Sequence, residues 1–558
     1  MTAQVRDFPV RWQQPGDESV QWRFFVQSFP NQVPPLEFDV LVRRIMAGAD
    51  HAFARLKGSS QGSLARRVNT YVYRAAAPQT SDAAPEASVP DALRALRDAV
   101  DDLPRSWAED HLPRLRAFLD DFGGVDLGGL PDADLAAHFE RACAELGELW
   151  ERHFLILFPA AAAVNEFERT YRDLFGQDGA LTPYRLLGGV PNKTVEAGKA
   201  LWRLSRLAAD VPPVREVLER TEPEQVVPVL ETAPEGRAFL AELRDFLRAY
   251  GQRGDMCSLT AESWLEDPAP VVRTIASYLR RPDSASPELT QRRAAEEREE
   301  AVGGVRARLA GYPRPVAELF EQLLSVAQVG TALTEEHTFY IDYGGVHQVR
   351  RIVLELGRRL VDRGALARRE DVFMLGDEDL RAAFTAPGTV DVAAAVRANE
   401  DEMRRFAGVA PPPAIGSGAP PAMSPTFMAF MRNMSGMGGP PPGAVPPAEP
   451  GTVRGVPGSA GVVRGVVRVV RTLAESDRLG PGEILVAPTT APPWTPLFAV
   501  AGGIVTDTGG VLSHCAVVAR EYGVPTVVGA AGATSTLVDG QVVEVDGSTG
   551  VVRVVGGP

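Results

Sequence analysis

Cysteine is scarce in this sequence of 558 residues. The three cysteines, Cys143, Cys257 and Cys515, lie far apart, which predicts neither a disulfide framework nor a cysteine-based metal cluster, and we expect no bound metal. Long apolar runs are missing too: no stretch approaches about 18 consecutive apolar residues, the length that a membrane-spanning helix needs. Because the N-terminus also lacks the apolar segment of a signal peptide, we expect a cytoplasmic protein without a membrane partner.

Positive charge is in deficit. The chain has 58 lysines and arginines against 72 acidic residues, for a formal net charge of −14. This balance argues against nucleic acid or an anionic membrane as the main partner. Hydrophobic residues make up 45% of the chain, and its length is enough for roughly two to four domains. We therefore expect a multidomain globular protein with a large core.

Changes in composition divide the chain into four parts. Residues 1–38 are polar and proline-bearing and read as an extended N-terminal lead-in. From 39 to 408, apolar residues recur at helical spacing, as in "FDVLVRRIMAGADHAFARL" and "VRRIVLELGRRLVDRGAL". Residues 409–450 are rich in Pro, Gly and Met and read as a linker.

The pattern changes to β after residue 451. Valine-rich segments bounded by Gly, Pro and Asp predict strands, for example "GEILVAP", "GQVVEVDG" and "GVVRVV". One helix is predicted among them, from Ser513 to Tyr522. The fold class is therefore a large, mainly α-helical domain followed by a small β/α domain of 451–558.

A single histidine, His514, stands where the segment "VTDTGGVLSH" meets that helix. Ser513 is a plausible N-cap, so His514 falls in the first turn, where free backbone N–H groups and the helix dipole favour an anion. Gly509 and Gly510 leave room for an approaching phosphate. Such an imidazole could carry a phosphoryl group covalently. Taken alone, a histidine near a helix start is more often an ordinary surface residue.

The longer segment "TDTGGVLSHCAVVAREYGVPTVVG" resembles the phosphohistidine signature of phosphoenolpyruvate-utilising enzymes, which include the rifampin phosphotransferases. The resemblance extends over 451–558 and implies a swivelling domain with His514 as the phosphorylated residue. Cys515 stands where the family usually has alanine, and we assign it no role. The residues that the resemblance places around the phosphate are Thr506, Thr508, Gly509, Gly510, Ser513 and Arg520.

The helical part resembles the substrate-binding domain of rifampin phosphotransferase relatives, through "YGQRGDMCSLTAESWLEDP" and "EEHTFYIDYGGVHQVRR". Arg253 is retained from the family pattern, and the resemblance implies that it binds the substrate. Gln252, Cys257 and Leu259 replace a histidine and two acidic residues of that pattern. Losing those groups removes side chains that could orient or deprotonate an acceptor, so the acceptor site is remodelled or no longer performs the family reaction.

The second of these segments concentrates polar side chains. A carboxylate next to a histidine, Glu336 and His337, could act as general base toward an acceptor hydroxyl. Tyr340, Asp342, Arg350 and Arg351 could bind the substrate, with Arg350 neutralising the transferring group. The alternative is a solvated or salt-bridged helix face. Upstream, Trp150, His153 and Phe154 are expected to pack in the core.

The nucleotide-binding machinery of the complete family enzymes has no counterpart in the sequence. There is no G-x-x-x-x-G-K-[ST] loop, and the resemblance includes no ATP-grasp domain. ATP and Mg are therefore expected only through a separate ATP-grasp partner, as for the related phosphohistidine subunit of phenylphosphate synthase. In the family, ATP yields AMP, inorganic phosphate and a phosphorylated acceptor.

Three functions follow from these observations. In the first, His514 carries a phosphoryl group to a small hydroxylated molecule bound in the helical domain. In the second, His514 acts directly as acid or base in an ATP-independent dehydratase- or cyclase-like enzyme. In the third, the chain is a non-catalytic relative that only binds a ligand. The extent of the His514 motif favours the first.

Overall fold

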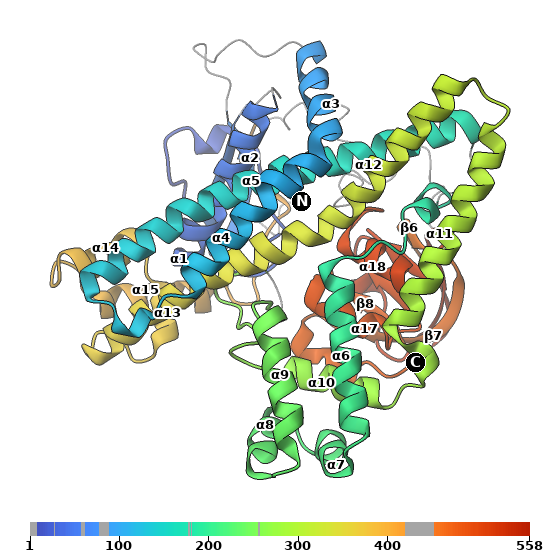
Figure 1. Ribbon diagram of the computed structural model, residues 1–558. Helices are drawn as coiled ribbons and strands as arrows, with labels where there is room; N and C mark the ends of the chain where they lie inside the picture. The colour runs from blue at the N-terminus through green and yellow to red at the C-terminus, as the bar shows by residue number, and fades with distance from the viewer. Residues whose placement is uncertain are drawn as a thin grey trace. The chain divides into compact units, whose positions relative to one another are not determined.

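The structure is a computed structural model that describes residues 8–26, 28–56, 62–77, 89–176, 179, 181–254, 257–418 and 451–557 (Figure 1). The chain divides into two compact units. The first consists of Met1–Ile156, Cys257–Ala261 and Tyr340–Met423, and the second of Leu157–Met256, Glu262–Phe339 and Ser424–Pro558. The predicted helical domain of 39–408 therefore contributes to both units. The predicted linker lies outside the described residues from position 419 onward.

The first unit is mainly helical, as the apolar periodicity predicts. Its helical segments are η1 (Asp17–Ser19), α1 (Pro35–Glu37), η2 (Phe38–Val42), α2 (Arg43–Arg55), α3 (Val89–Ser106), η3 (Trp107–His111), α4 (Leu112–Gly123), η4 (Leu127–Gly129), the start of α5 (Asp132–Phe175), most of η7 (Phe339–Gly345), α13 (Val346–Asp362), η8 (Arg369–Met374), α14 (Asp377–Thr385) and α15 (Val392–Phe406). Helix α1 begins at Pro35, inside the predicted extended lead-in.

A small antiparallel sheet in the first unit was not predicted. Its strand order is β2-β3-β1-β4, with β1 Trp22–Phe24, β2 Ser63–Val68, β3 Tyr71–Ala76 and β4 Ala414–Ile415. Asn69 and Thr70 join β2 to β3 with φ of 49° and 74°. Two consecutive left-handed residues form the tight turn that suits a twisted hairpin. Aromatic residues on β3 pack in a core, and this packing outweighs the helical character of the surrounding sequence.

Helices of the second unit pack in two apolar clusters. One joins α6 to α10, and the other joins α5, α11 and α12. The helical segments are η5 (Pro183–Leu186), α6 (Lys193–Ala209), α7 (Pro212–Arg220), α8 (Pro223–Thr232), α9 (Gly236–Tyr250), α10 (Ala269–Leu279), η6 (Asp283–Ala285), α11 (Pro287–Leu309) and α12 (Arg314–Thr338), with the end of α5. Among the described helices, none has a segment long and apolar enough to span a bilayer.

An eight-stranded sheet forms the C-terminal part of the second unit, in the order β5-β12-β11-β7-β8-β9-β10-β6. The four strands β7 to β10 are parallel, and the outer pairings are antiparallel. The elements are β5 (Thr452–Arg454), β6 (Val456–Ser459), β7 (Val462–Val469), η9 (Leu473–Arg478), β8 (Ile484–Ala487), η10 (Pro492–Trp494), α17 (Thr495–Phe498), β9 (Gly503–Thr506), α18 (His514–Tyr522), β10 (Thr526–Val528), α19 (Ala533–Thr536), β11 (Val542–Asp546) and β12 (Val551–Gly556). The fold class predicted from the sequence, a helical region followed by a small β/α domain, is confirmed.

Neighbouring residues of the central strands serve opposite faces of this sheet. On β9, Ile504 packs in a cluster with residues of α17 and α18, whereas Val505 packs in a second cluster with the other strands and α19. Alternation of this kind follows from the two-residue period of a strand. Both faces are apolar because both are covered, which explains the continuous valine-rich runs in the sequence.

Helix α18 is the crossover between the parallel strands β9 and β10, and it confirms the predicted helix from Ser513 to Tyr522. Ser513 is its N-cap, because the hydroxyl accepts a hydrogen bond from the N–H of Ala516. Gly523 ends the helix with φ of 64°, a left-handed conformation that glycine adopts without a Cβ penalty. His514 is therefore the first helical residue.

The same helix packs against the helical part of the second unit, and Figure 1 shows α18 next to α11. Leu512, just before α18, joins the cluster of α5, α11 and α12. The Arg520 guanidinium lies 5.1 Å from the ring centroid of Tyr184. Oε1 of Glu521 accepts the backbone N–H of Gly189 at 2.8 Å. We call this set of contacts the docking surface of α18.

Glu521 makes docking sensitive to pH. The side chain is buried, and its Oε2 has no hydrogen-bond partner among the described residues. Burial raises the pKa of Glu521 to about 7, although the Gly189 N–H and the Arg520 and Arg298 charges oppose part of the shift. Glu521 is therefore more protonated in the folded protein than in the unfolded chain between about pH 4.5 and 7, and its contribution to stability falls as pH rises through that window.

We predict that Glu521→Gln, which keeps an acceptor but no charge, removes this loss. Near pH 5 the two proteins should have similar free energies of unfolding, whereas at pH 8 the variant should be more stable by about 3 kcal/mol. Urea unfolding at several pH values measures the difference. Glu216→Gln, at an exposed site on α7, is the control and should follow the wild type. Parallel profiles for wild type and Glu521→Gln would contradict the prediction.

Candidate functional site

His514 pairs with a buried carboxylate in the second unit. Its Nδ1 lies 3.0 Å from both oxygens of Glu335, which is on α12. The side chains are 12% and 4% exposed, so the pair is largely shielded from water. A hydrogen bond to a carboxylate is stronger in such surroundings than on the surface.

Two further groups hold Glu335 in its ionised form. Burial raises the pKa of Glu335, but the opposing effects of His514, of the Thr194 hydroxyl and of the Arg253 charge are together larger, so the pKa is lowered overall. The Thr194 hydroxyl, on α6, donates to Oε2 at 2.9 Å. Glu335 is therefore a charged acceptor with a fixed orientation, and it accepts a hydrogen bond from the N–H at Nδ1 of His514.

This arrangement determines which nitrogen of His514 can react. Because Nδ1 carries the proton of the hydrogen bond to Glu335, the lone pair of the neutral imidazole is on Nε2. The hydroxyl of Thr495, on α17, lies 3.5 Å from Nε2. The ring of Phe498 meets the imidazole edge to face, with centroids 6.2 Å apart. Nε2 is thus the nucleophilic or basic atom, with a hydroxyl beside it.

The loop before α18 brings the predicted phosphate-binding residues together. Gly509 has φ of 114°, and a Cβ there would lie 3.0 Å from the Ser513 hydroxyl oxygen, so only glycine suits the position. Ser513 donates to the carbonyl of Gly510 at 2.7 Å, and Thr506 donates to that of Thr508 at 2.7 Å. Both hydroxyls thus stabilise the loop through hydrogen bonds to its own backbone.

Arg520 has a different environment from the other predicted phosphate-binding residues. Its guanidinium donates to the carbonyl of Gly458 at 2.9 Å and covers the ring of Tyr184. Burial lowers the pKa of Arg520 to about 10, although the nearby Tyr184 and Glu521 oppose this. These contacts make Arg520 part of the docking surface, and a role toward phosphate stays a prediction.

The predicted acceptor-side base consists of Glu336 and His337, which lie on α12 directly after Glu335. Burial raises the pKa of Glu336, and the charge of Lys193 opposes part of this shift. His337 is 1% exposed, and its Nδ1 lies 2.5 Å from the carbonyl oxygen of Leu333, one turn earlier. That contact places a proton on Nδ1 and the lone pair on Nε2.

Sequence reasoning missed Glu335, Thr194 and Thr495. Glu335 is adjacent to the predicted Glu336, and consecutive helical residues point about 100° apart, so only the packing of α12 decides which of them meets His514. Thr194 lies two residues after Asn192, the N-cap of α6. The sequence there indicates the start of a helix but no contact with a distant glutamate.

Arg253 also belongs to the second unit. Its side chain is 2% exposed, and the guanidinium lies 5.2 Å from the ring centroid of Phe339. Its charge contributes to the lowered pKa of Glu335, so the arginine retained from the family pattern acts on the carboxylate that holds His514.

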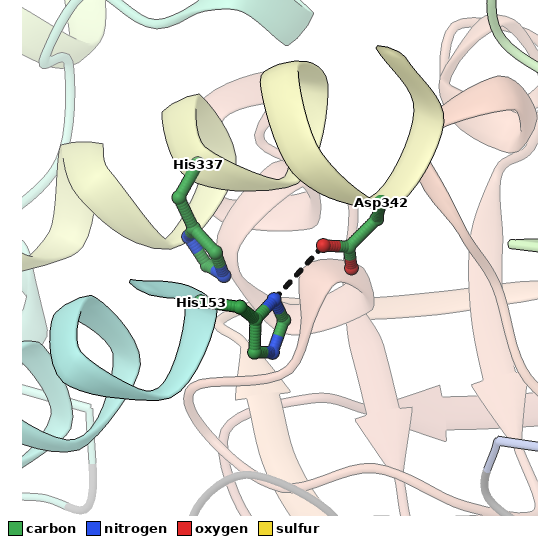
Figure 2. Close-up of side chains that lie close together, drawn as sticks. All are labelled: His153, His337 and Asp342. Atoms are coloured by element: carbon green, nitrogen blue, oxygen red, sulfur yellow. Dashed lines mark hydrogen bonds and ion pairs between the residues drawn. The ribbon is translucent and has the colours of Figure 1, made fainter. Parts of the chain in front are cut away.

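In the first unit, Asp342 forms a pair with His153. Nδ1 of His153 and Oδ1 of Asp342 are 2.9 Å apart (Figure 2). The predicted packing of Trp150, His153 and Phe154 is confirmed, since the imidazole lies 4.8 Å from the Trp150 ring centroid and 4.7 Å from that of Phe154. His153 thus joins an aromatic core to a carboxylate, which its sequence context did not indicate.

Of two departures from the family pattern, Cys257 contacts the backbone of Asp342, and Leu259 contacts a buried carboxyl group, that of Glu37. The Cys257 thiol donates to the backbone carbonyl of Asp342 at 3.2 Å. Burial raises the pKa of Cys257 well above its usual value, and the charges of Asp342 and Glu37 add to the effect, so the thiol stays protonated. Glu37 accepts the N–H of Leu259 at 3.2 Å, and burial raises its pKa.

The remaining predicted substrate-binding residues of the first unit contact protein groups. Tyr340 is 6% exposed and its ring lies 6.2 Å from that of Trp107. Arg350 donates to the carbonyl of Leu259 at 2.6 Å. Arg351 donates to the side chain of Gln348 at 2.7 Å. The arginines support the surrounding backbone and helix here, and their predicted contacts to substrate stay predictions.

Comparison with known proteins gives two family matches. Residues 153–335 match the rifampicin phosphotransferase fourth domain, and residues 479–550 match the mobile domain of PEP-utilising enzymes. The second match contains His514, and the first contains Glu335, so the pair joins two recognised domains.

Individual relatives agree with these matches. The chain is 38% identical to a chondramide synthase of Chondromyces crocatus over 98% of its own length and 14% of the relative's. It is 31% identical to the uncharacterised phosphotransferase YvkC of Bacillus subtilis over 73% of its length and 47% of the relative's. It is 29% identical to the rifampicin phosphotransferase of Streptomyces sviceus over 65% and 40%, respectively. The chain thus spans less than half the length of each of these relatives.

The two domain matches and the relatives named as phosphotransferases support the resemblance found in the sequence. Both domains are present in one chain, and the histidine of the mobile domain is paired with a carboxylate of the fourth domain. Residues 153–335 thus belong to the family of rifampicin phosphotransferase fourth domains, and residues 479–550 belong to the family of mobile domains of PEP-utilising enzymes.

Proposed function

We propose that this protein is a phosphotransferase component in which His514 carries a phosphoryl group to a hydroxyl of a small organic molecule. The observation that carries the proposal is the hydrogen bond between Nδ1 of His514 and the Glu335 carboxylate, because it leaves the Nε2 lone pair ready to attack phosphorus. The mobile-domain match supports the same role for this residue.

In the first step, Nε2 of His514 forms a bond to the phosphorus atom of a donor, and the bond from phosphorus to the donor's leaving oxygen breaks. The donor is ATP, held with Mg by an ATP-grasp domain outside these 558 residues. Phosphorylation at Nε2 makes the ring cationic while Nδ1 keeps its proton, and the negative Glu335 stabilises that charge. Glu335 is therefore a positioning residue, since it acts through the imidazole.

In the second step, the acceptor oxygen bonds to phosphorus, the N–P bond breaks, and its electron pair returns to Nε2. A base must take the hydroxyl proton, and we assign this role to His337, whose lone pair is on Nε2. Glu336 lies next to it on α12. Since a related segment belongs to a chondramide synthase, we take the acceptor to be an intermediate in the biosynthesis of a secondary metabolite.

We predict that phosphoramidate, a chemical phosphoryl donor to imidazoles, labels His514 faster than the other histidines. Intact-mass analysis should show an acid-labile adduct of one phosphoryl group, and peptide mapping should place it on residue 514. The adduct should be absent from His514→Ala and unchanged in His51→Asn, which alters an exposed histidine of the first unit. An adduct that persists in His514→Ala would contradict the assignment.

We also predict that Glu335→Gln slows this labelling by about 10- to 100-fold, because the neutral amide no longer stabilises the charge on the ring. Glu335→Asp should recover part of the rate. Glu318→Gln, which changes an exposed glutamate of the same helix, is the matched control and should react like the wild type.

The pH dependence of the labelling rate separates positioning from folding. Glu335→Gln removes a negative charge beside the imidazole, so the pH profile of labelling should differ between the two proteins while their circular dichroism spectra stay the same. Equal rates and equal pH profiles would contradict a role for Glu335.

One observation favours a second function. A histidine with one nitrogen bonded to a buried carboxylate is also the arrangement of a general base, so the same pair could act directly on a substrate in an ATP-independent elimination or cyclisation. Turnover of a biosynthetic intermediate by the purified chain without nucleotide would support this function. A strict requirement for ATP and an ATP-grasp domain would support the phosphotransferase instead.

A further inference from the structure

A cavity of about 100 Å³ lies inside the second unit, between α10 and the β/α domain. Its wall on the helical side includes Trp264, Arg273 and Arg280. On the other side, Leu479 and residues of α17, Pro496 and Leu497, complete the lining. The cavity therefore exists only while the β/α domain is docked on the helices.

Two buried donors that line this cavity lack partners. Trp264 is 4% exposed, and its Nε1 has no hydrogen-bond partner among the described residues. The same is true of Nε of Arg273. Nη2 of Arg273 lies 3.7 Å from a carboxylate oxygen of Glu224. Buried N–H groups without acceptors are rare and costly, so these two indicate an acceptor that a ligand would supply.

Size, charge and lining restrict what that ligand can be. Leucine, valine and proline side chains make up most of the wall on the β/α side, so the body of the ligand is apolar. Two arginines against one aspartate, Asp477, favour a negative group. The volume is below the ~150 Å³ of a cavity that binds benzene, which limits the ligand to a short branched chain.

We propose that this cavity binds a small apolar carboxylate, whose oxygens accept hydrogen bonds from the Trp264 indole N–H and the Arg273 guanidinium. Neither His514 nor Glu335 lines this cavity, and the proposal does not depend on whether His514 is phosphorylated. Binding at this cavity makes the chain responsive to a small-molecule effector, which the descriptions of the two matched domains do not mention.

Occupation of the cavity has a consequence for docking. A ligand there contacts α10 and α17 together and so binds the docked arrangement in preference to any other, which stabilises that arrangement by mass action. Helix α17 also carries Thr495, whose hydroxyl lies 3.5 Å from Nε2 of His514. The effector would therefore prolong the state in which His514 faces Glu335.

Isobutyrate is a suitable probe, with isobutanol as its uncharged counterpart. Isothermal titration calorimetry on the full chain should detect isobutyrate binding with a Kd in the millimolar range, and isobutanol should bind about tenfold more weakly or not at all. Hydrogen exchange of the α18 amides should slow when isobutyrate binds, because docking is stabilised.

Two variants and one control test the assigned contacts. Trp264→Phe keeps an aromatic ring without the N–H, and Arg273→Met keeps an unbranched chain without the charge; each should weaken isobutyrate binding about tenfold. Arg215→Met, at a half-exposed arginine on α7, should leave it unchanged. Circular dichroism of each variant confirms that it is folded.

The proposal is overturned if isobutyrate up to about 20 mM does not bind the wild type. It is also overturned if Trp264→Phe and Arg273→Met, both folded, bind isobutyrate as the wild type does. Binding that depends on these residues but leaves exchange of the α18 amides unchanged would overturn the effect on docking, because a ligand that bridges α10 and α17 must slow that exchange.

Discussion

The bond between His514 and Glu335 is the interaction on which the proposed chemistry depends. It joins the first turn of α18 to the last turns of α12, and both side chains are nearly excluded from water. A buried carboxylate is costly unless it is paired, so Glu335 needs the imidazole, Thr194 and Arg253 as much as the imidazole needs Glu335. Removing any of the three partners would raise the pKa of Glu335.

The docking surface gives this bond its geometry. Contacts by Leu512, Arg520 and Glu521 hold α18 along its length, so the position of His514 is determined by many interactions besides its own. Several of these groups are polar and buried, which makes the surface weaker than an apolar one of equal area and easier to open. That suits a domain whose relatives are described as mobile.

The sequence predicted the β/α domain well because local signals there are strong and consistent. Ser513 and Gly523 mark the ends of α18, and valine-rich runs between glycines mark the strands. His514 itself was predicted from the same local pattern. The hairpin of β2 and β3 was not, because its stability comes from packing of Tyr71 and Tyr73 with distant residues.

The partners of His514 could not be predicted for a similar reason. Glu335 and Glu336 are equivalent in sequence, and only the orientation of α12 against α18 distinguishes them. Asp342 shows the same limit of local patterns. Its neighbours in sequence predicted a substrate ligand, whereas its partner in the structure is His153, 189 positions away. Local patterns identify reactive residues, whereas tertiary contacts decide what each of them meets.

Helix α18 carries its reactive group at one end and its docking contacts at the other. Within nine residues, His514 is placed for chemistry, and Arg520 and Glu521 are placed for recognition of the helical part. Because the two ends are rigidly joined, substitutions near the C-terminal end can change how long the imidazole stays at its partner without altering the imidazole. A family with this helix can therefore acquire new partners and new rates by evolving residues that never touch phosphate.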